Sequence, residues 1–209
     1  MLAIDHIVIV AHNPEQAAQK FEDEHSVKVI QGGKHDYWGT YNYLAYFDNN
    51  SYIEWIGLFD RKIAAKSDNP LIQEVVEALD HNQEGIVQYA LRTENMDGLV
   101  EHFSKAGISF TGPIPGSRNR PDGSTLEWRM LFPQSTKEEE LPFLIEWGPV
   151  KNTPSDRSLI NSQQITSLSA MINNMEEFSH VFQLHFDDDS TQLSNTELKV
   201  ADKLTFSLG

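Results

Sequence analysis

Four polar side chains in this sequence have the donor chemistry of a metal site. Glu54 and Glu146 occupy the middle of the tripeptide Ile-Glu-Trp, which occurs twice, and His6 and Gln88 each lie eight residues before a predicted helix start. One imidazole nitrogen, one amide oxygen and two carboxylate oxygens suit a divalent ion such as Fe, Mn, Ni, Co or Zn. Such an ion would keep positions open for adjacent oxygens of a small molecule and would stabilise a developing enolate. We therefore expect His6, Glu54, Gln88 and Glu146 to be metal ligands at one site.

The same side chains also allow a structural interpretation. His6 could be a partly buried histidine that pairs with Asp5, and Gln88 could be an ordinary strand residue. Glu54 and Glu146 lie in apolar segments, where an ionised carboxylate needs a cation, hydrogen bonds or a proton. An arginine could supply that partner without any metal, so both interpretations stay open at this point.

Further residues could move a proton or contact a substrate. His35 lies between glycines and titrates near neutral pH, so it could be a general base or an additional ligand. Glu146 is the other candidate for proton transfer. Asn42, Trp128 and Arg129 are expected to contact the substrate. Because neighbouring strand residues point to opposite faces, at most one of Trp128 and Arg129 should face a central cleft.

These candidates lie on two copies of a β-α-β-β-β pattern, which predicts an α+β fold. Asn-Pro at 13–14 and Asn at 95 are helix-cap signals, and a third capped helix opens at 69–70 and links the copies. Paired βαβββ modules would form a curved eight-stranded mixed sheet around a central cleft. The predicted strands are 3–11, 27–31, 42–47 and 52–58 in the first copy, and 86–92, near 109, 125–132 and 142–147 in the second.

The predicted organisation has four parts. The first module covers 1–62, a linking helix 63–84, and the second module 85–150. The chain becomes polar after Pro154, and 155–209 then has a strand, helix and strand pattern typical of a partial third module or a dimerisation segment. Ser167 takes the place of His6 in this part, so we expect packing or subunit contact there rather than a ligand site.

Composition narrows the function. The 209 residues include 16 Lys plus Arg, 31 Asp plus Glu and no cysteine, for a net charge of −15. The absence of cysteine excludes disulfides, thiolate metal sites and cysteine nucleophiles. The acidic balance argues against a nucleic-acid partner, because binding to phosphates depends on clustered Lys and Arg. The sequence has no signal-peptide pattern and no apolar run of the ~20 residues that a membrane span needs, so we expect a cytoplasmic protein.

Several short motifs resemble a known family. Their order, more than any single motif, makes the likeness specific, and the resemblance covers residues 2 to about 150. The motifs are Asp5-His6-Ile7-Val8, Gly39-Thr40-Tyr41-Asn42, Tyr52-Ile53-Glu54, the loop 117–123, Leu126-Glu127-Trp128-Arg129 and the strand 141–147. They resemble the glyoxalase-like subfamily of the vicinal-oxygen-chelate superfamily, which includes glyoxalase I, bleomycin-resistance proteins and extradiol dioxygenases.

The resemblance implies a fold, a metal and a class of reaction. Carried over, the superfamily's ligand positions fall on His6, Glu54, Gln88 and Glu146. Gln88 stands where glyoxalase I commonly has histidine. Extradiol dioxygenases use two histidines and one glutamate for iron, so Gln88 argues against dioxygenase chemistry. Thr153-Pro154 replaces a His-Pro pair that the subfamily often has. The implied function is a divalent-metal-dependent lyase or isomerase for a small molecule with adjacent oxygens. The alternative is a metal-free drug- or metabolite-binding protein of the bleomycin-resistance type, and a homodimer is the predicted assembly.

Overall fold

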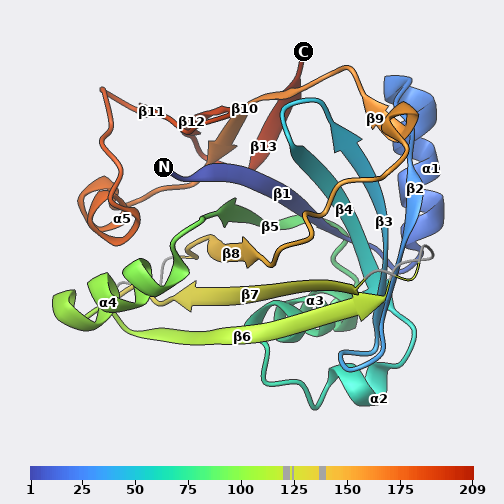
Figure 1. Cartoon of the computed structure of the whole chain (residues 1–209), viewed down its shortest axis with the longest axis horizontal. Coiled ribbons are helices and arrows are strands. Elements are labelled where there is room, and N and C mark those ends of the chain that lie inside the picture. Colours follow the sequence, from blue (N-terminus) through green and yellow to red (C-terminus); the bar gives the residue numbers. More distant parts are fainter. Residues whose placement is uncertain (120–122, 124, 137–139) are drawn as a thin grey trace.

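Two β-α-β-β-β units join edge to edge into one curled sheet (Figure 1). The computed structural model describes residues 1–119, 123, 125–136 and 140–209. The first unit consists of β1 (Ala3–Val10), α1 (Pro14–His25), β2 (Ile30–His35), β3 (Thr40–Phe47) and β4 (Ser51–Leu58). The second unit consists of β5 (Gly85–Arg92), α4 (Met96–Ala106), β6 (Phe110–Asn119), β7 (Thr125–Pro133) and β8 (Phe143–Trp147).

The sheet topology repeats within each unit. The strand order is β2-β3-β4-β1-β5-β8-β7-β6 in the described part of the chain, and the short strand β9 (Ile160–Asn161) adds to β3. The first strand of each unit pairs in parallel with the last, as β1 with β4 and β5 with β8. The two first strands meet antiparallel at the centre. The predicted fold class, with paired modules around a curved mixed sheet, is confirmed.

Local signals in the sequence begin the helices where they were predicted. The side chain of Asn13 accepts a hydrogen bond from the Gln16 amide at the start of α1, and Asn95 caps α4 in the same way. Such side chains satisfy backbone donors that the first helical turn leaves unpaired. The second strand differs from the prediction, because it continues to His35 through a bulge at Gly32. His35 therefore lies at a strand end rather than in a loop.

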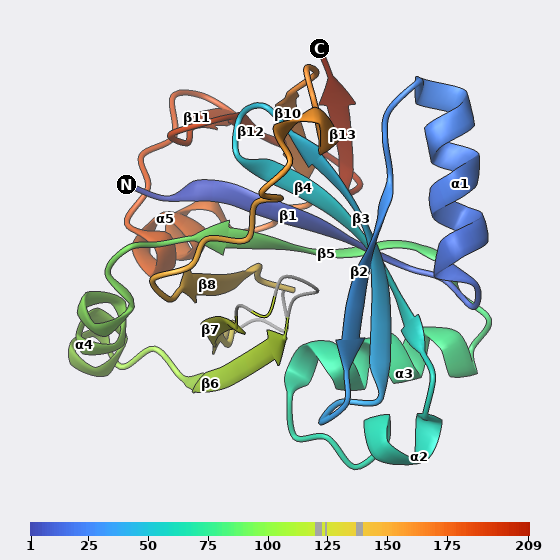
Figure 2. The same ribbon diagram turned by 45° about the vertical axis from the view of Figure 1, so that its right-hand side comes forward.

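A helix between the units closes part of the concave side of the sheet (Figure 2). It is α3 (Pro70–Asp80), which follows the short helix α2 (Arg61–Ala64). Its apolar residues, including Leu71, Ile72 and Val75, share a core with strand residues from both units. The helix therefore fixes the curvature of the sheet and leaves only part of the concave side for a ligand.

The C-terminal part of the fold is a small sheet with one helix, and its strands pair as the strands of the two units do. Its elements are β10 (Ile165–Ala170), α5 (Met175–Phe182), β11 (Ser190–Gln192), β12 (Glu197–Val200) and β13 (Thr205–Leu208). β10 pairs in parallel with β12 and antiparallel with β13, as β1 does with β4 and β5. Its buried residues share one core with residues of the large sheet, such as Ile4 and Ile7. None of the helices described is both long and apolar enough to cross a membrane.

Candidate functional site

A β-bulge in the central strand places two neighbouring polar side chains together. The pairing of β1 with β5 shifts between Ile4 and His6, so Asp5 is an extra residue in the ladder. Neighbouring residues of a regular strand point to opposite faces, whereas a bulge re-aims them. As a result Asp5 Oδ1 lies 2.7 Å from His6 Nδ1, and both side chains are buried. This confirms the pairing of His6 with Asp5 that the sequence allowed.

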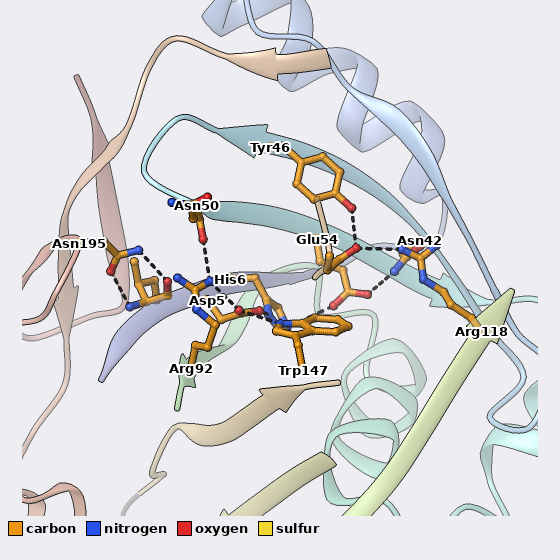
Figure 3. Close-up of polar contacts among 12 residues, drawn as sticks. Asp5, His6, Asn42, Tyr46, Asn50, Glu54, Arg92, Arg118, Trp147 and Asn195 are labelled. Atoms are coloured by element: carbon orange, nitrogen blue, oxygen red, sulfur yellow. Dashed lines mark hydrogen bonds and ion pairs between the residues drawn. The ribbon is translucent and has the colours of Figure 1, made fainter. Parts of the chain in front are cut away.

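The second ring nitrogen of His6 faces a carboxylate. Glu54 Oε2 lies 3.5 Å from His6 Nε2, and Asn42 donates a hydrogen bond of 2.5 Å to the other oxygen of Glu54. The His6 ring stacks on Tyr52, with 4.5 Å between the ring centroids. Three neighbouring strands thus fix one chain of contacts, from Asp5 through His6 and Glu54 to Asn42 (Figure 3).

Asp5 is held in its charged form. Burial alone would raise its pKa, but hydrogen bonding and attraction from His6, together with Arg92 and Trp147, keep the pKa below its usual value. The Arg92 guanidinium and the Trp147 indole each donate to Asp5 Oδ2 at 3.0 Å. Because this carboxylate can only accept hydrogen bonds, His6 Nδ1 must carry a proton. His6 Nε2 is therefore the atom that can exchange a proton with Glu54.

His6 and Glu54 line a small inner cavity that leads into a wider cleft. The inner cavity has a volume of about 40 Å³ and is also lined by His35, Asn42 and Arg118. The wider cleft has about 640 Å³ and shares with it His35 and three indoles, those of Trp38, Trp128 and Trp147. Only a small group of a ligand can reach His6 and Glu54, while a planar apolar body can lie among the indoles.

His35 lies at this cavity as a neutral imidazole. Its Nδ1 is 3.0 Å from the Thr40 hydroxyl, and 8% of the residue is exposed. Burial lowers its pKa to about 4, with Arg118 adding to the effect and Glu54 opposing it. At neutral pH the ring is therefore uncharged and can accept a proton, although the burial that keeps it neutral also makes it a weak base.

Glu146 points away from His6 and Glu54. Its Oε2 accepts hydrogen bonds from Arg129, at 3.1 Å from Nε, and its Oε1 accepts from the backbone amide of Met96 at 2.9 Å. Met96 begins α4, where a carboxylate is favoured by the exposed amides of the first turn. The interpretation in which an arginine pairs with Glu146 is the one that the structure shows.

The strand register explains this placement of Glu146. Val8 and Ala90 each lie five residues before the asparagine that caps the next helix. Val8 pairs with Glu54 in the first unit, and Ala90 pairs with Phe143 in the second. The counterpart of Glu54 is therefore Phe143, three residues before Glu146. A shift by an odd number of residues sends a side chain to the other face of a sheet.

Gln88 also lies apart from the inner cavity. Gln88 is the counterpart of His6, because each directly follows the bulge residue of its strand, Asp5 in β1 and Val87 in β5. The Gln88 amide donates to the carbonyl of Leu141 at 3.3 Å, and its oxygen accepts from the neighbouring amide of Tyr89. The structure does not bring Gln88 or Glu146 to His6 and Glu54.

The residues present do not fit the four-ligand divalent ion expected from the sequence. His6 and Glu54 offer two donors. Of their counterparts, Phe143 has no donor atom, and the Gln88 amide is engaged by Leu141 and Tyr89 and does not line the inner cavity. Within the described ranges, no group of three or more His, Cys, Asp or Glu side chains is arranged to hold a metal ion.

The predicted substrate contacts are placed unequally. Asn42 and Trp128 line the inner cavity. Arg129 lines the wider cleft, as Trp128 does, and is held there by Glu146 and by Asp97, whose Oδ1 lies 2.7 Å from its Nη1. Tyr52, Trp147 and Arg118 belong to the site as well, and all three stand in the motifs that carry the family resemblance. Trp147 could have been suspected from the repeated Ile-Glu-Trp. In the motif at 117–123, residues 120–122 lie outside the described part of the chain.

Comparisons with known proteins agree with this geometry. A family model described as a glyoxalase-like domain matches residues 4–184. No curated protein matches the sequence. A crystal structure of a hypothetical protein from Staphylococcus aureus has a TM-score of 0.79 at 18% identity and covers 99% of this chain and 89% of its own.

Two further solved structures share the two-unit part of the fold. A variant of Streptomyces coelicolor methylmalonyl-CoA epimerase in complex with 2-nitronate-propionyl-CoA has a TM-score of 0.51 at 18% identity and covers 72% of this chain and 98% of that chain. A hypothetical protein from Bacillus halodurans has a TM-score of 0.52 at 13% identity, and the match covers 74% of this chain and 99% of that chain. At these identities the likeness concerns the fold alone. Since the family model spans most of the sequence, the chain belongs to the glyoxalase-like family of the vicinal-oxygen-chelate superfamily.

Proposed function

We propose that this chain is an enzyme of the isomerase or lyase class that moves a proton on a small carbonyl compound, with Glu54 and His6 as its acid–base pair. One observation carries the proposal: His6 Nε2 and Glu54 Oε2 lie 3.5 Å apart at the wall of the inner cavity, and Asp5 fixes the other ring nitrogen. A base, a second group that accepts its proton and an orienting carboxylate are the parts that general acid–base catalysis needs.

The chemical step follows from these groups. Glu54 removes a proton from a carbon next to a carbonyl, so that the C–H bond breaks and an O–H bond forms on the carboxylate. The electron pair of the C–H bond moves toward the carbonyl, whose oxygen gains the negative charge of an enolate. His6 Nε2 can take the proton from Glu54 and return it, because Asp5 stabilises the imidazolium. Return of the proton to the other face or to another atom gives an isomer, and loss of an adjacent group gives elimination.

The family supports proton transfer at a carbon without requiring a particular substrate. Methylmalonyl-CoA epimerase, whose structure shares the two-unit fold, is named for a reaction that inverts a carbon centre. The sequence suggested that a divalent ion would stabilise the enolate, but the donor set does not fit one. In this chain Asn42, hydrogen-bonded to Glu54, and Arg118 are the neighbouring groups that can donate hydrogen bonds to a developing oxyanion.

A second candidate function is the binding of a planar molecule without chemistry. The observation that favours it is the aromatic wall of the cleft, where the Trp128 ring lies 5.9 Å from that of Trp38 and 5.5 Å from that of Trp147. Indoles at these separations present a large apolar contact area to a flat ligand. A cytoplasmic location and a homodimer remain predictions from the sequence.

Exchange of carbon-bound hydrogen with solvent tests the proposal. The purified full-length chain is incubated in D2O with a panel of 2-oxo acids, β-keto esters and acyl thioesters, and deuterium incorporation is measured by mass spectrometry. We expect incorporation into at least one class, a loss on the order of a hundredfold or more in Glu54→Gln, and no change when EDTA is added.

The matched control is Glu146→Gln, which removes the other carboxylate of the repeated tripeptide. It should keep the exchange rate and lose about 1 kcal/mol of stability through its hydrogen bonds to Arg129 and Met96. Exchange that survives Glu54→Gln, or that EDTA abolishes, contradicts the proposal. Binding of a panel member without any exchange favours the second candidate.

A further inference from the structure

Arg118 reaches across the mouth of the curled sheet to the inner cavity. It lies near the end of β6, one edge of the sheet, and its guanidinium donates to the backbone carbonyl of Gly32 on β2, the opposite edge. Figure 3 shows the Arg118 side chain extending from β6 toward Asn42. Its Nη2 lies 3.3 Å from Asn152 Oδ1. A Cβ atom at Gly33 would lie 2.9 Å from Arg118 Nη1, so the glycine at this position leaves room for the guanidinium.

The charge of Arg118 has no anionic partner among the described residues. Arg92 pairs with Asp5 and Arg129 with Glu146, whereas no carboxylate in the described ranges lies within ion-pair distance of Arg118. The two acceptors that the structure describes for it are neutral, a backbone carbonyl and an amide oxygen. A partly buried cation whose described acceptors are neutral has lost hydration that these acceptors replace only in part. A ligand that brings a negative charge would give it a charged partner.

The surroundings of Arg118 select a small oxyanion. Its neighbours around the inner cavity include the neutral imidazole of His35 and the amides of Asn42 and Asn152. The carboxylate of Glu54 lines the same cavity, but its oxygens face Asn42 and His6 and form no ion pair with Arg118. The cavity volume of about 40 Å³ is close to that of a single carboxylate group and leaves no space for a large head group. A guanidinium matches a carboxylate with two parallel hydrogen bonds.

We infer that Arg118 is the specificity-determining residue of this site and that it binds the carboxylate of a 2-oxo or 2-hydroxy acid with a planar apolar body. The inference rests on the proposed function, because such a compound carries its acidic carbon close to the carboxylate that Arg118 holds. With the carboxylate at Arg118, that carbon lies toward Glu54 and the planar body lies in the cleft among Trp38, Trp128 and Trp147.

Arg118 could instead serve only to join the two edges of the sheet. In that case its loss would weaken every ligand alike and would lower the melting temperature. The two roles are separated by comparing a charged probe with its neutral counterpart on the same proteins.

The test measures binding of phenylpyruvate and of its methyl ester by titration calorimetry. The wild-type chain should bind the acid at least about tenfold more tightly than the ester, since a hydrogen-bonded charge pair contributes roughly ten- to a hundredfold. Arg118→Gln should lose this preference while it keeps its affinity for the ester. Arg118→Lys should keep part of the preference because the charge remains. Arg61→Gln, which removes a surface arginine paired with Asp80, is the matched control and should bind both probes as the wild type does.

Each outcome decides between the two roles of Arg118. Equal binding of acid and ester by the wild-type chain, no binding of either at millimolar concentration, or an acid preference that survives Arg118→Gln would overturn the inference. An equal loss of both ligands with a lower melting temperature would assign Arg118 to the sheet edges alone.

Failure of the proposed function gives a different result. Glu54→Gln should still bind phenylpyruvate with the acid preference of the wild type, but it should no longer exchange deuterium. If acid-selective binding depends on Arg118 and no protein exchanges deuterium, the carboxylate site stands and the catalytic proposal fails. If exchange depends on Glu54 but acid and ester bind alike, the catalytic proposal stands and the inference about Arg118 fails.

Discussion

The two halves of the cleft have the same backbone and opposite chemistry. Where the first unit has Glu54, the second unit has Phe143 at the position that the strand pairing makes equivalent. Gln88, the equivalent of His6, donates to the carbonyl of Leu141 and does not line the inner cavity. Phe143 shares one apolar core with α3 residues such as Ile72. The second half therefore supports the helix that closes the concave side, and the acid–base pair lies in the first half.

This difference shows what a duplicated fold preserves. Duplication keeps the strand order and the pairing of first with last strand, because these depend on many backbone hydrogen bonds. The side chains at two equivalent positions can change independently, since each sits in its own packing environment. A four-ligand metal site needs side chains from both units. An acid–base pair needs side chains from only one unit, and here they come from the first.

The largest expected effect comes from the bulge of β1, where Asp5 takes the position that Val87 has in the bulge of β5. Asp5→Asn keeps the size of the side chain but removes the charge that orients His6 and stabilises its imidazolium. We expect deuterium exchange to fall on the order of a thousandfold, with the ligand affinity retained. The exchange rate and calorimetric binding are measured on the same preparation. An exchange rate within a few-fold of the wild type would show that His6 and Glu54 transfer the proton without the carboxylate of Asp5.

The second prediction concerns the stability of the polar half against acid. The pKa of His35 is lowered to about 4 in the folded chain, against 6.5 for the free side chain, because burial disfavours the charged ring. The unfolded chain therefore binds a proton between pH 6.5 and 4 that the folded chain does not, and stability falls as the pH drops through this window. The contribution is at most about 3 kcal/mol, and it is fully present above the pKa of the unfolded chain.

The measurement for His35 is a difference between two proteins. Glu74, whose pKa is raised to about 8 by burial and by nearby Glu140 and Glu77, shifts stability in the opposite direction, since a protonated buried carboxyl is favoured at low pH. Urea unfolding of the wild type and of His35→Gln at about pH 7 and about pH 4 cancels that common term. The wild type should lose up to about 3 kcal/mol relative to the variant on acidification. Parallel pH profiles of the two proteins would mean that His35 takes up a proton as readily in the folded chain as in the unfolded chain.

The smallest expected effect comes from the small sheet, which supports the polar half through its backbone. The Asn195 side chain accepts from the Ile4 amide at 2.9 Å and donates to the Ile4 carbonyl at 3.0 Å, next to the bulge at Asp5. Asn195→Ala should cost about 2 kcal/mol in urea unfolding and lower the exchange rate as well. Asn174→Ala removes the cap of α5 in the same part of the fold and should cost about 1 kcal/mol without changing exchange. Equal effects on exchange would show that Asn195 contributes only general stability.

The sequence predicts the fold better than the site for a physical reason. Strands and capped helices are specified by local patterns, as the asparagines before α1 and α4 show. The face on which a side chain lies depends on register, and the repeated Ile-Glu-Trp aligns Glu146 with Glu54 although the strand pairing makes Phe143 its counterpart. Counting back from the helix start selects Gln88 as the counterpart of His6, as the two bulges do, but the Gln88 side chain donates to the Leu141 carbonyl and does not line the inner cavity.

Other features of the site could not be read from a local pattern at all. The bulge at Asp5 arises where β1 meets β5, two strands far apart in the sequence. The contact of Arg118 with Gly32 depends on how strongly the whole sheet curls, because it joins the two edges. Five residues were predicted for the site from their residue types, and the structure places all of them around the inner cavity. They are His6, His35, Asn42, Glu54 and Trp128.

The hydrogen bonds between Asn195 and Ile4 also bear on the order in which the molecule can be completed during synthesis. The two residues are 191 positions apart, so the segment that holds the backbone beside Asp5 leaves the ribosome long after Asp5 itself. Domains generally fold from the N-terminus as the chain emerges. Both units of the large sheet can therefore form first. The geometry of Asp5 and His6 is completed only when the small sheet docks. A nascent chain would thus form the large sheet before it has a working acid–base pair.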